Sequence, residues 1–190
     1  SLYLERHDFF DRMYDALPEY AKGYIRALMA IQLQIQGYDL IEASLAPVMA
    51  DLCRACPIEI EPGSRVTREY MYTRCVIDQR LTSIERIDLL EAVAKEHPVD
   101  LFTYIRGLSM ANVNEHGTVE YLEEAPVVFK RSRVNLNITL QSIKNGIPLR
   151  AFDVMGAGGF LLSDLQSGFL DLFVPGNDFV YYETREDLVR

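Results

Sequence analysis

Hydrophobic residues recur at helical spacing through the first quarter of the chain. They are spaced three or four residues apart, which places their side chains on one face of a helix. Gly37 ends this run, and Pro47 starts or breaks the next segment. The pattern therefore predicts helices over residues 8 to 55, with a core-facing stripe of Tyr24, Ile25, Leu28, Met29, Ile31 and Ile35.

A second helical pattern runs from about residue 67 to 96, after a connector at residues 57–64 that contains two prolines and a glycine. Within it, Thr82 and Glu85 have the spacing of a capping box. In a capping box the hydroxyl accepts an amide at the helix start while the carboxylate reaches back. We therefore expect a new helix to begin near residue 83, with Ile84, Ile87, Leu90 and Val93 along one face.

From Pro98 onward the pattern changes to short β-branched and aromatic runs separated by turns. Helical stretches separate some of these runs, at 125–133 and 148–157. Strands that alternate with helices favour an α/β fold with a parallel sheet, in which ligands bind beyond the carboxyl ends of the strands. The expected strands are 99–105, 117–122, 134–140, 159–164 and 179–183.

Composition and charge exclude several classes of protein. The 190 residues suit one domain, or one domain with a helical appendage, and the net charge of -9 argues against a nucleic-acid-binding surface. No apolar run approaches the roughly 20 residues of a membrane span, and Ser1 does not open a signal peptide. Three cysteines do not make a disulfide framework. We therefore expect a soluble cytoplasmic protein.

The candidate metal and acid–base residues do not form a recognisable site. Cys53 and Cys56 have C-x-x-C spacing, but no second pair or His pair completes a zinc site. His7, His97 and His116 lie apart in sequence and match no metal-binding or catalytic spacing. We expect His97 at a helix end and His116 in a turn. The sequence thus predicts no metal site and identifies no catalytic residue.

Arg150 lies in the first turn of the helix expected at 148–157, where the positive end of the helix dipole disfavours a cation. Free amides at such a terminus bind anions, and a guanidinium beside them can grip a phosphate. Asp153 lies on the same helix face and can accept hydrogen bonds from the vicinal hydroxyls of a ribose. The spacing fits equally well a surface ion pair between Arg150 and Asp153.

The glycines at 156–159 follow the helix expected at 148–157, whereas the glycines of a dinucleotide or phosphate loop precede it. Gly158 can adopt the left-handed conformation that ends a helix, and small residues let a helix approach a sheet. We therefore predict a structural role for this stretch.

Two segments together resemble the C-terminal part of the spore maturation protein CgeB-like glycosyltransferases, bacterial relatives of the group 1 glycosyltransferases. They read RVNLNITLQSIKNGIPLRAFDVMGAGGFLLSD and LDLFVPGNDFVYYETREDLV. The resemblance is close over residues 128–190 and weaker in the helical front half. It implies the C-terminal, Rossmann-like half of a GT-B fold, which binds a nucleoside diphosphate sugar.

The resemblance also implies roles for individual residues. Asp153 matches the second Glu of the E-x7-E motif, which contacts the ribose, and Arg150 matches the family arginine. Asn145 stands where the first Glu is expected, so the family contact to the donor sugar is altered. Residues 119–126 resemble the strand and turn that hold the nucleobase. The implied substrate-binding residues are Ser142, Asn145, Gly146, Arg150, Asp153, Tyr121 and Leu122.

The resemblance further implies a donor-binding domain excised from a longer protein. Ser1-Leu2-Tyr3 resembles the end of the first strand of that domain, residues 1–97 hold a helical insertion, and residues 98–190 hold the nucleotide-sugar site. An N-terminal acceptor domain is expected outside this chain, and the acceptor is a glycan, a protein or a small molecule. The resemblance implies no resident cofactor, because GT-B enzymes usually transfer the sugar without a metal. Two alternatives remain open: a non-catalytic nucleotide-binding or interaction module, and a structural protein whose helical half docks a partner.

Overall fold

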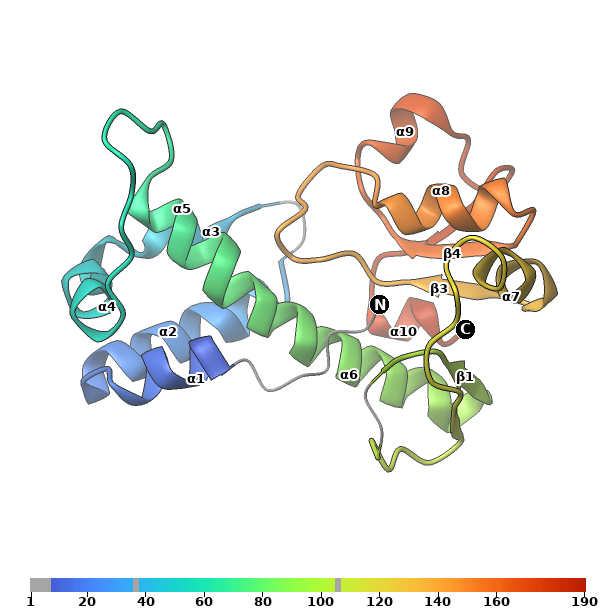
Figure 1. The fold of residues 1–190 in the computed structure, drawn as a ribbon, viewed down its shortest axis with the longest axis horizontal. Helices are drawn as coiled ribbons and strands as arrows, with labels where there is room; N and C mark the ends of the chain where they lie inside the picture. Colours follow the sequence, from blue (N-terminus) through green and yellow to red (C-terminus); the bar gives the residue numbers. More distant parts are fainter. Residues whose placement is uncertain (1–7, 36–37, 105–106) are drawn as a thin grey trace. The chain divides into compact units, whose positions relative to one another are not determined.

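The computed structural model describes residues 8–35, 38–104 and 107–190. The predictions made for Ser1-Leu2-Tyr3, His7 and Gly37 lie outside these residues. The described chain forms two compact units. We name residues 8–85 and 140–144 the helical unit, and residues 86–139 and 145–190 the α/β unit, in each case for the described residues only (Figure 1).

The two helical stretches that the hydrophobic spacing predicts are present, and that prediction is confirmed. The helical unit holds the first stretch and the second as far as residue 85. The connector at 57–64 holds no helix or strand, as expected. The π-helical turn η2 joins α5 directly to α6. The elements are α1 (Asp8–Asp15), α2 (Glu19–Gln32), α3 (Leu40–Ser44), η1 (Ala46–Val48), α4 (Met49–Ala55), α5 (Arg68–Tyr72), η2 (Thr73–Ile77) and the first part of α6 (Asp78–Glu96).

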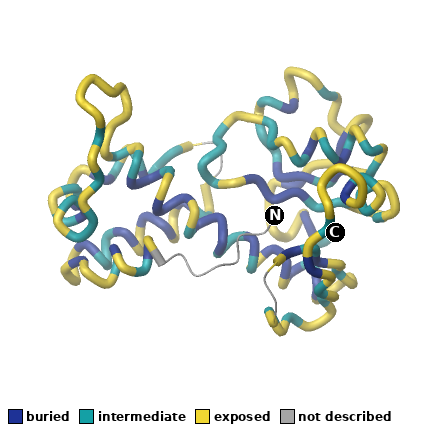
Figure 2. Tube along the Cα trace, viewed as in Figure 1, coloured by how far each residue is buried: buried dark blue, intermediate teal, exposed yellow. Residues whose placement is uncertain are grey.

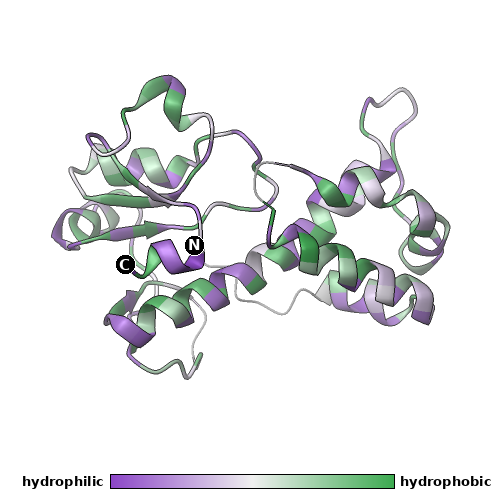
Figure 3. Ribbon diagram, turned by 180° about the vertical axis from the view of Figure 1, so that it is seen from behind, coloured by the Kyte–Doolittle hydropathy of each residue, from purple (hydrophilic) through white to green (hydrophobic). Residues whose placement is uncertain are grey.

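One hydrophobic cluster fills the helical unit, where the apolar faces of its helices meet (Figure 3). Ile25, Leu28 and Met29 lie in it as predicted, but Ile31 and Ile35 are 46% and 37% exposed. Helix α2 ends at Gln32, whose buried amide donates to the carbonyls of residues 35 and 38 at 2.9 Å. The helical spacing therefore does not continue to Ile35.

The predicted helix start near residue 83 is wrong, because α6 runs unbroken from Asp78 to Glu96. The hydroxyl of Thr82 donates to the Asp78 carbonyl at 2.7 Å and accepts from the Gln141 amide at 2.9 Å. Glu85 accepts from the Gln141 side chain at 2.8 Å. Both residues of the expected capping box thus bind a segment more than fifty positions away in sequence.

The α/β unit confirms the predicted fold class, a mixed α/β fold with parallel strands and flanking helices. The helices expected at 125–133 and 148–157 are present. The strand expected at 117–122 is absent, and a strand at 113–115 takes its place. The elements after α6 are β1 (Val99–Leu101), β2 (Val113–Glu115), α7 (Ala125–Arg131), β3 (Asn135–Asn137), α8 (Leu149–Gly156), β4 (Leu161–Asp164), α9 (Phe169–Leu172), β5 (Val180–Tyr182) and α10 (Arg185–Leu188).

The described strands form two parallel sheets rather than one: β1–β2, and β3–β4–β5 with β4 in the middle. Strand β4 is largely buried (Figure 2) because both of its faces are covered. Leu161 packs with α8 and α9 on one face, and Leu162 packs with α6 and α10 on the other. This arrangement follows from the alternation of side chains along a strand.

A buried carboxylate joins the carboxyl ends of β3 and β4. Oδ1 of Asp164 accepts the backbone amide of Thr139 at 2.8 Å and its hydroxyl at 2.7 Å, and Oδ2 accepts from Gln166 at 2.7 Å. The Asn137 amide donates to the Ser163 hydroxyl at 2.9 Å. These contacts fix the point at which the chain leaves β3 toward α8.

We expect Asp164→Ala to lower the free energy of unfolding by about 1–3 kcal/mol, because the buried amide of Thr139 loses its acceptor. Urea denaturation measures this change. Asp164→Asn keeps an acceptor oxygen and should cost less. Asp178 also accepts a backbone amide at 2.8 Å but is exposed, so Asp178→Ala is the matched control with the smallest effect. Equal losses in all three variants would contradict this account of the junction.

Candidate functional site

The N-terminus of α8 follows the loop that leaves β3. Pro148 caps the helix without a side-chain hydrogen bond, and its first turn holds no acidic residue. The Ala151 amide donates to the Pro148 carbonyl at 2.9 Å. The amides of Leu149 and Arg150 have no partner within the helix and carry partial positive charge. The helix start predicted from the sequence is thus present, one residue later than expected.

Arg150 lies in the first turn of α8 and is about one-third exposed. Its guanidinium lies over the ring of Phe129 in α7, 5.2 Å from the ring centroid. Nη1 lies 4.0 Å from Oδ2 of Asp153, which is too long for a hydrogen bond. The ring of Phe129 and the carboxylate of Asp153 offset the unfavourable interaction of Arg150 with the helix dipole. Asp153 does not use the hydrogen-bond donors of the guanidinium.

Asp153 accepts a hydrogen bond of 2.7 Å from the hydroxyl of Tyr121. This bond and the nearby negative charge raise the pKa of Tyr121 above its usual value, because a phenolate loses the bond and faces a carboxylate. The structure therefore brings together three predicted site residues, Arg150, Asp153 and Tyr121, from segments about thirty positions apart. The sequence predicted each of them but not the bond between two of them.

Asn145 and Gly146 are exposed in the loop before α8. The Asn145 carbonyl accepts the amide of Gly168 at 3.0 Å, and its side-chain oxygen accepts from Ser167 at 3.4 Å. A Cβ atom on Gly168 would lie 2.4 Å from that carbonyl oxygen, so only glycine fits there. The turn before α9 therefore holds the backbone of Asn145.

The other two predicted site residues are placed differently. Leu122 is 76% exposed in the turn before α7, next to Tyr121. Ser142 belongs to the helical unit, so the structure does not group it with Arg150.

The glycines after α8 have the structural role expected of them. Gly158 has a φ of +74°, the left-handed conformation that ends a helix. A Cβ atom on Gly159 would lie 2.7 Å from the carbonyl oxygen of Phe129 and 2.8 Å from the amide of Asn135. Gly159 thus permits the close packing of α7 against the start of β4.

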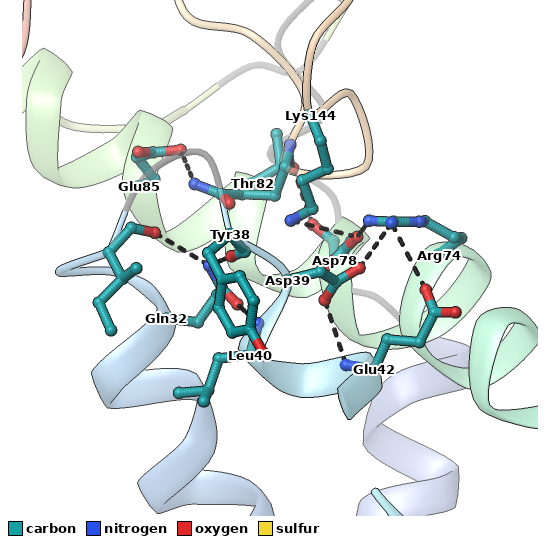
Figure 4. A network of polar contacts seen from close by, with 12 residues as sticks. Gln32, Tyr38, Asp39, Leu40, Glu42, Arg74, Asp78, Thr82, Glu85 and Lys144 are labelled. Carbon is teal, nitrogen blue, oxygen red and sulfur yellow. Dashed lines mark hydrogen bonds and ion pairs between the residues drawn. The ribbon is translucent and has the colours of Figure 1, made fainter. Parts of the chain in front are cut away.

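A charged cluster, which no sequence pattern had indicated, lies inside the helical unit (Figure 4). Asp78 has no exposed side-chain surface, and its Oδ2 lies 2.9 Å from Arg74 Nη1 and 3.9 Å from Lys144 Nζ. Arg74 also pairs with Asp39 and Glu42. Burial raises the pKa of Asp78, while the two cations oppose that increase. The partners of Asp78 lie close in sequence except Lys144, which comes from the loop after β3.

The histidines and cysteines form no such cluster in the described chain. His116 lies 2.7 Å from Asp100 and stacks on Phe102, and its hydrogen bond lowers the pKa of Asp100. Cys53 and Cys56 are free thiols. Among the described residues, no three His, Cys, Asp or Glu side chains gather to hold a metal ion. In the same residues, no helix is long and apolar enough to cross a membrane.

A protein-family model described as glycosyl transferase-like matches residues 86–190, which is more than half of the chain. The match begins at Arg86, where the described part of the α/β unit also begins. It contains Arg150, Asp153 and Tyr121, and the first 85 residues lie outside it. No curated protein and no solved structure matches the chain.

We expect Asp153→Asn to lower the pKa of Tyr121 toward its usual value of about 10, because the neutral amide does not repel the phenolate. A ¹³C NMR titration of labelled tyrosine rings, assigned with Tyr121→Phe, measures this pKa. In the wild type the stabilisation from this bond is present below the unfolded pKa and is lost as pH rises through the higher folded pKa. Asp171→Asn is the control, and an unchanged pKa in Asp153→Asn would contradict the contact.

Proposed function

The chain belongs to this glycosyl transferase-like family, and we propose that its α/β unit binds the nucleoside diphosphate sugar from which a glycosyl group is transferred. The observation that carries the proposal is the grouping of Arg150, Asp153 and Tyr121 at the uncapped start of α8. This start lies beyond the carboxyl end of β3, where ligands bind in parallel α/β sheets.

The proposed roles follow the chemistry of each group. Arg150 and the first amides of α8 hold the diphosphate, since both present hydrogen-bond donors and positive charge. Asp153 accepts from the ribose hydroxyls. Tyr121 and Leu122 lie in the turn that faces the nucleobase, and Tyr121 also orients Asp153 through their hydrogen bond. Asn145 and Gly146 face the donor sugar.

The chemical contribution of this unit is electrostatic. Breaking the bond between the anomeric carbon and the diphosphate leaves negative charge on the departing oxygen. Fixed donors aimed at that charge stabilise the transition state more than the ground state. Arg150 and the start of α8 are those donors in this proposal. We assign no general acid or base to this chain and expect no resident cofactor.

More specifically, we propose that the protein is a CgeB-like hexosyltransferase of the GT-B type that acts in the cytoplasm. The donor half is the α/β unit, and the acceptor half is a domain outside this chain. The close match of residues 128–190 to the CgeB-like pattern supports this assignment. The acceptor is a glycan, a protein or a small molecule.

A non-catalytic nucleotide-binding or interaction module is the second candidate, and Asn145 is the observation that favours it. An amide replaces the carboxylate that the E-x7-E pattern has at this position. Its side-chain oxygen already accepts a hydrogen bond from Ser167 at 3.4 Å. Nucleotide binding without transfer or hydrolysis in the full-length protein would support this candidate over a transferase.

We expect calorimetric titration with UDP, GDP and their sugars to show binding of one nucleotide. Arg150→Ala should weaken that binding by about tenfold or more, because charge-assisted hydrogen bonds to the diphosphate are lost. Asp153→Ala should weaken it through the ribose contact. Arg150→Lys should recover only part of the affinity, since an ammonium lacks the planar fork.

Arg185→Ala is the matched control, because Arg185 forms an ion pair with Asp88 in the same unit, away from α8. It should bind as the wild type does. The same titrations on the full-length protein test whether the second domain completes the site. If neither this chain nor the full-length protein binds a nucleotide at millimolar concentration, the proposed donor site is wrong.

A further inference from the structure

The turn before α7 is closed by two of its own carboxylates. Oε2 of Glu124 accepts the backbone amide of Glu120 at 2.7 Å, and Oε2 of Glu120 accepts the backbone amide of Glu123. The amides of Leu122 and Glu123 lower the pKa of Glu120 below its usual value, because they bind its ionised form. Side chains of the turn thus bind amides that a strand at 117–122 would have offered to a neighbouring strand.

Backbone hydrogen bonds join this turn to α7. The Glu120 carbonyl accepts the amide of Glu124 at 3.2 Å and that of Ala125 at 2.9 Å. Ala125 is buried at the start of α7. Further along α7, Phe129 packs on the cluster that contains the buried side chains of α8. The turn is therefore attached to a helix that packs against α8.

The turn places the ring of Tyr121 beside α8. Tyr121 is 53% exposed, so packing alone does not fix its ring. Its hydroxyl nevertheless donates to Oδ1 of Asp153 at 2.7 Å. Holding an exposed side chain in one rotamer costs conformational entropy. This hydrogen bond therefore depends on the place at which the backbone of the turn holds Tyr121.

These contacts all lie within the α/β unit. We propose that Glu120 and Glu124 are positioning residues for the ribose contact, because their carboxylates close the turn that sets Tyr121 against Asp153. The inference rests on the proposed donor site, in which Asp153 accepts the ribose hydroxyls. In this role the two glutamates do not touch the substrate and act through Tyr121.

Two substitutions of Glu124 that remove the same charge test this role. Glu124→Ala removes the acceptor for the Glu120 amide, whereas Glu124→Gln keeps an acceptor oxygen. Loss of a negative charge would by itself favour an anionic diphosphate equally in both variants. A positioning role predicts that calorimetry finds the affinity for the bound ribonucleotide lowered about threefold or more in Glu124→Ala, with most of it retained in Glu124→Gln.

The 2′-deoxy form of the same nucleotide separates the ribose contact from the rest of the site. The wild type should bind it more weakly than the ribonucleotide, since one hydroxyl that Asp153 accepts from is missing. Glu124→Ala should reduce this preference, whereas a general weakening of the site would lower both affinities by the same factor. Glu186→Ala is the matched control, because it removes an exposed carboxylate in α10, on the face of the sheet opposite α8.

The pKa of Tyr121 supplies a readout that needs no ligand. In the chain without nucleotide, Glu124→Ala should lower this pKa toward its usual value of about 10 by more than Glu124→Gln does, because the bond to Asp153 is weakened. A ¹³C NMR titration of labelled tyrosine rings measures the difference. Thermal melts of all variants separate these results from general unfolding.

Each outcome supports or overturns the positioning role. Equal effects of Glu124→Ala and Glu124→Gln on affinity and on the pKa of Tyr121 overturn it and leave the donor site intact. A lower pKa of Tyr121 in Glu124→Ala, with an unchanged preference for the ribonucleotide, also overturns it. If the wild type binds no nucleotide, the donor site itself is wrong, and the positioning role falls with it.

Discussion

The hydrogen bonds between Asp164 and Thr139 fix the edge of the sheet from which the proposed site is built. A single carboxylate oxygen accepts both the backbone amide and the hydroxyl of Thr139. The ends of β3 and β4 are thereby joined at the point where the chain turns toward α8. These hydrogen bonds offset the cost of burying the carboxylate, and they satisfy the buried amide of Thr139. The direction of the loop, and hence the start of α8, depends on this junction.

Beyond Thr139, local structure no longer determines the course of the chain. Residues 140–144 contain no helix or strand, and their position comes from contacts with Thr82, Glu85 and Asp78 of α6. Helix α6 has its apolar contacts in both units, with Leu81 in the core of the helical unit and Leu89 in that of the α/β unit. Residues 140–144 lie within the family match, whereas the residues of α6 that they contact lie before it.

The sequence predicted those parts of the fold that are determined by neighbouring residues. The helices at 125–133 and 148–157, the strands around 135–137 and 161–164, and the left-handed Gly158 all followed from periodicity and turn chemistry. The prediction failed where a side chain binds a residue that is distant in sequence instead of the local partner expected for it. Thr82 and Glu85 have capping-box spacing, but Gln141 binds both of them inside a continuous helix. The alternation at 117–122 resembles a strand, yet Tyr121 is turned toward Asp153.

The candidate site shows the same division between local and distant causes. Arg150 and Asp153 were predicted because their spacing on one helix is local, but the spacing left open whether they serve each other or a ligand. The separation of 4.0 Å between Arg150 and Asp153 and the hydrogen bond from Tyr121 to Asp153 favour a ligand over an ion pair between the two residues.

The two side chains are held by other groups. Asp153 is oriented by a neutral hydroxyl rather than by Arg150, and the guanidinium lies on the ring of Phe129. An aromatic face supports a cation without using its hydrogen-bond donors. A guanidinium held in this way keeps its donors for an anion in the proposed donor site, and that anion would offset the position of the cation at the positive end of the helix dipole.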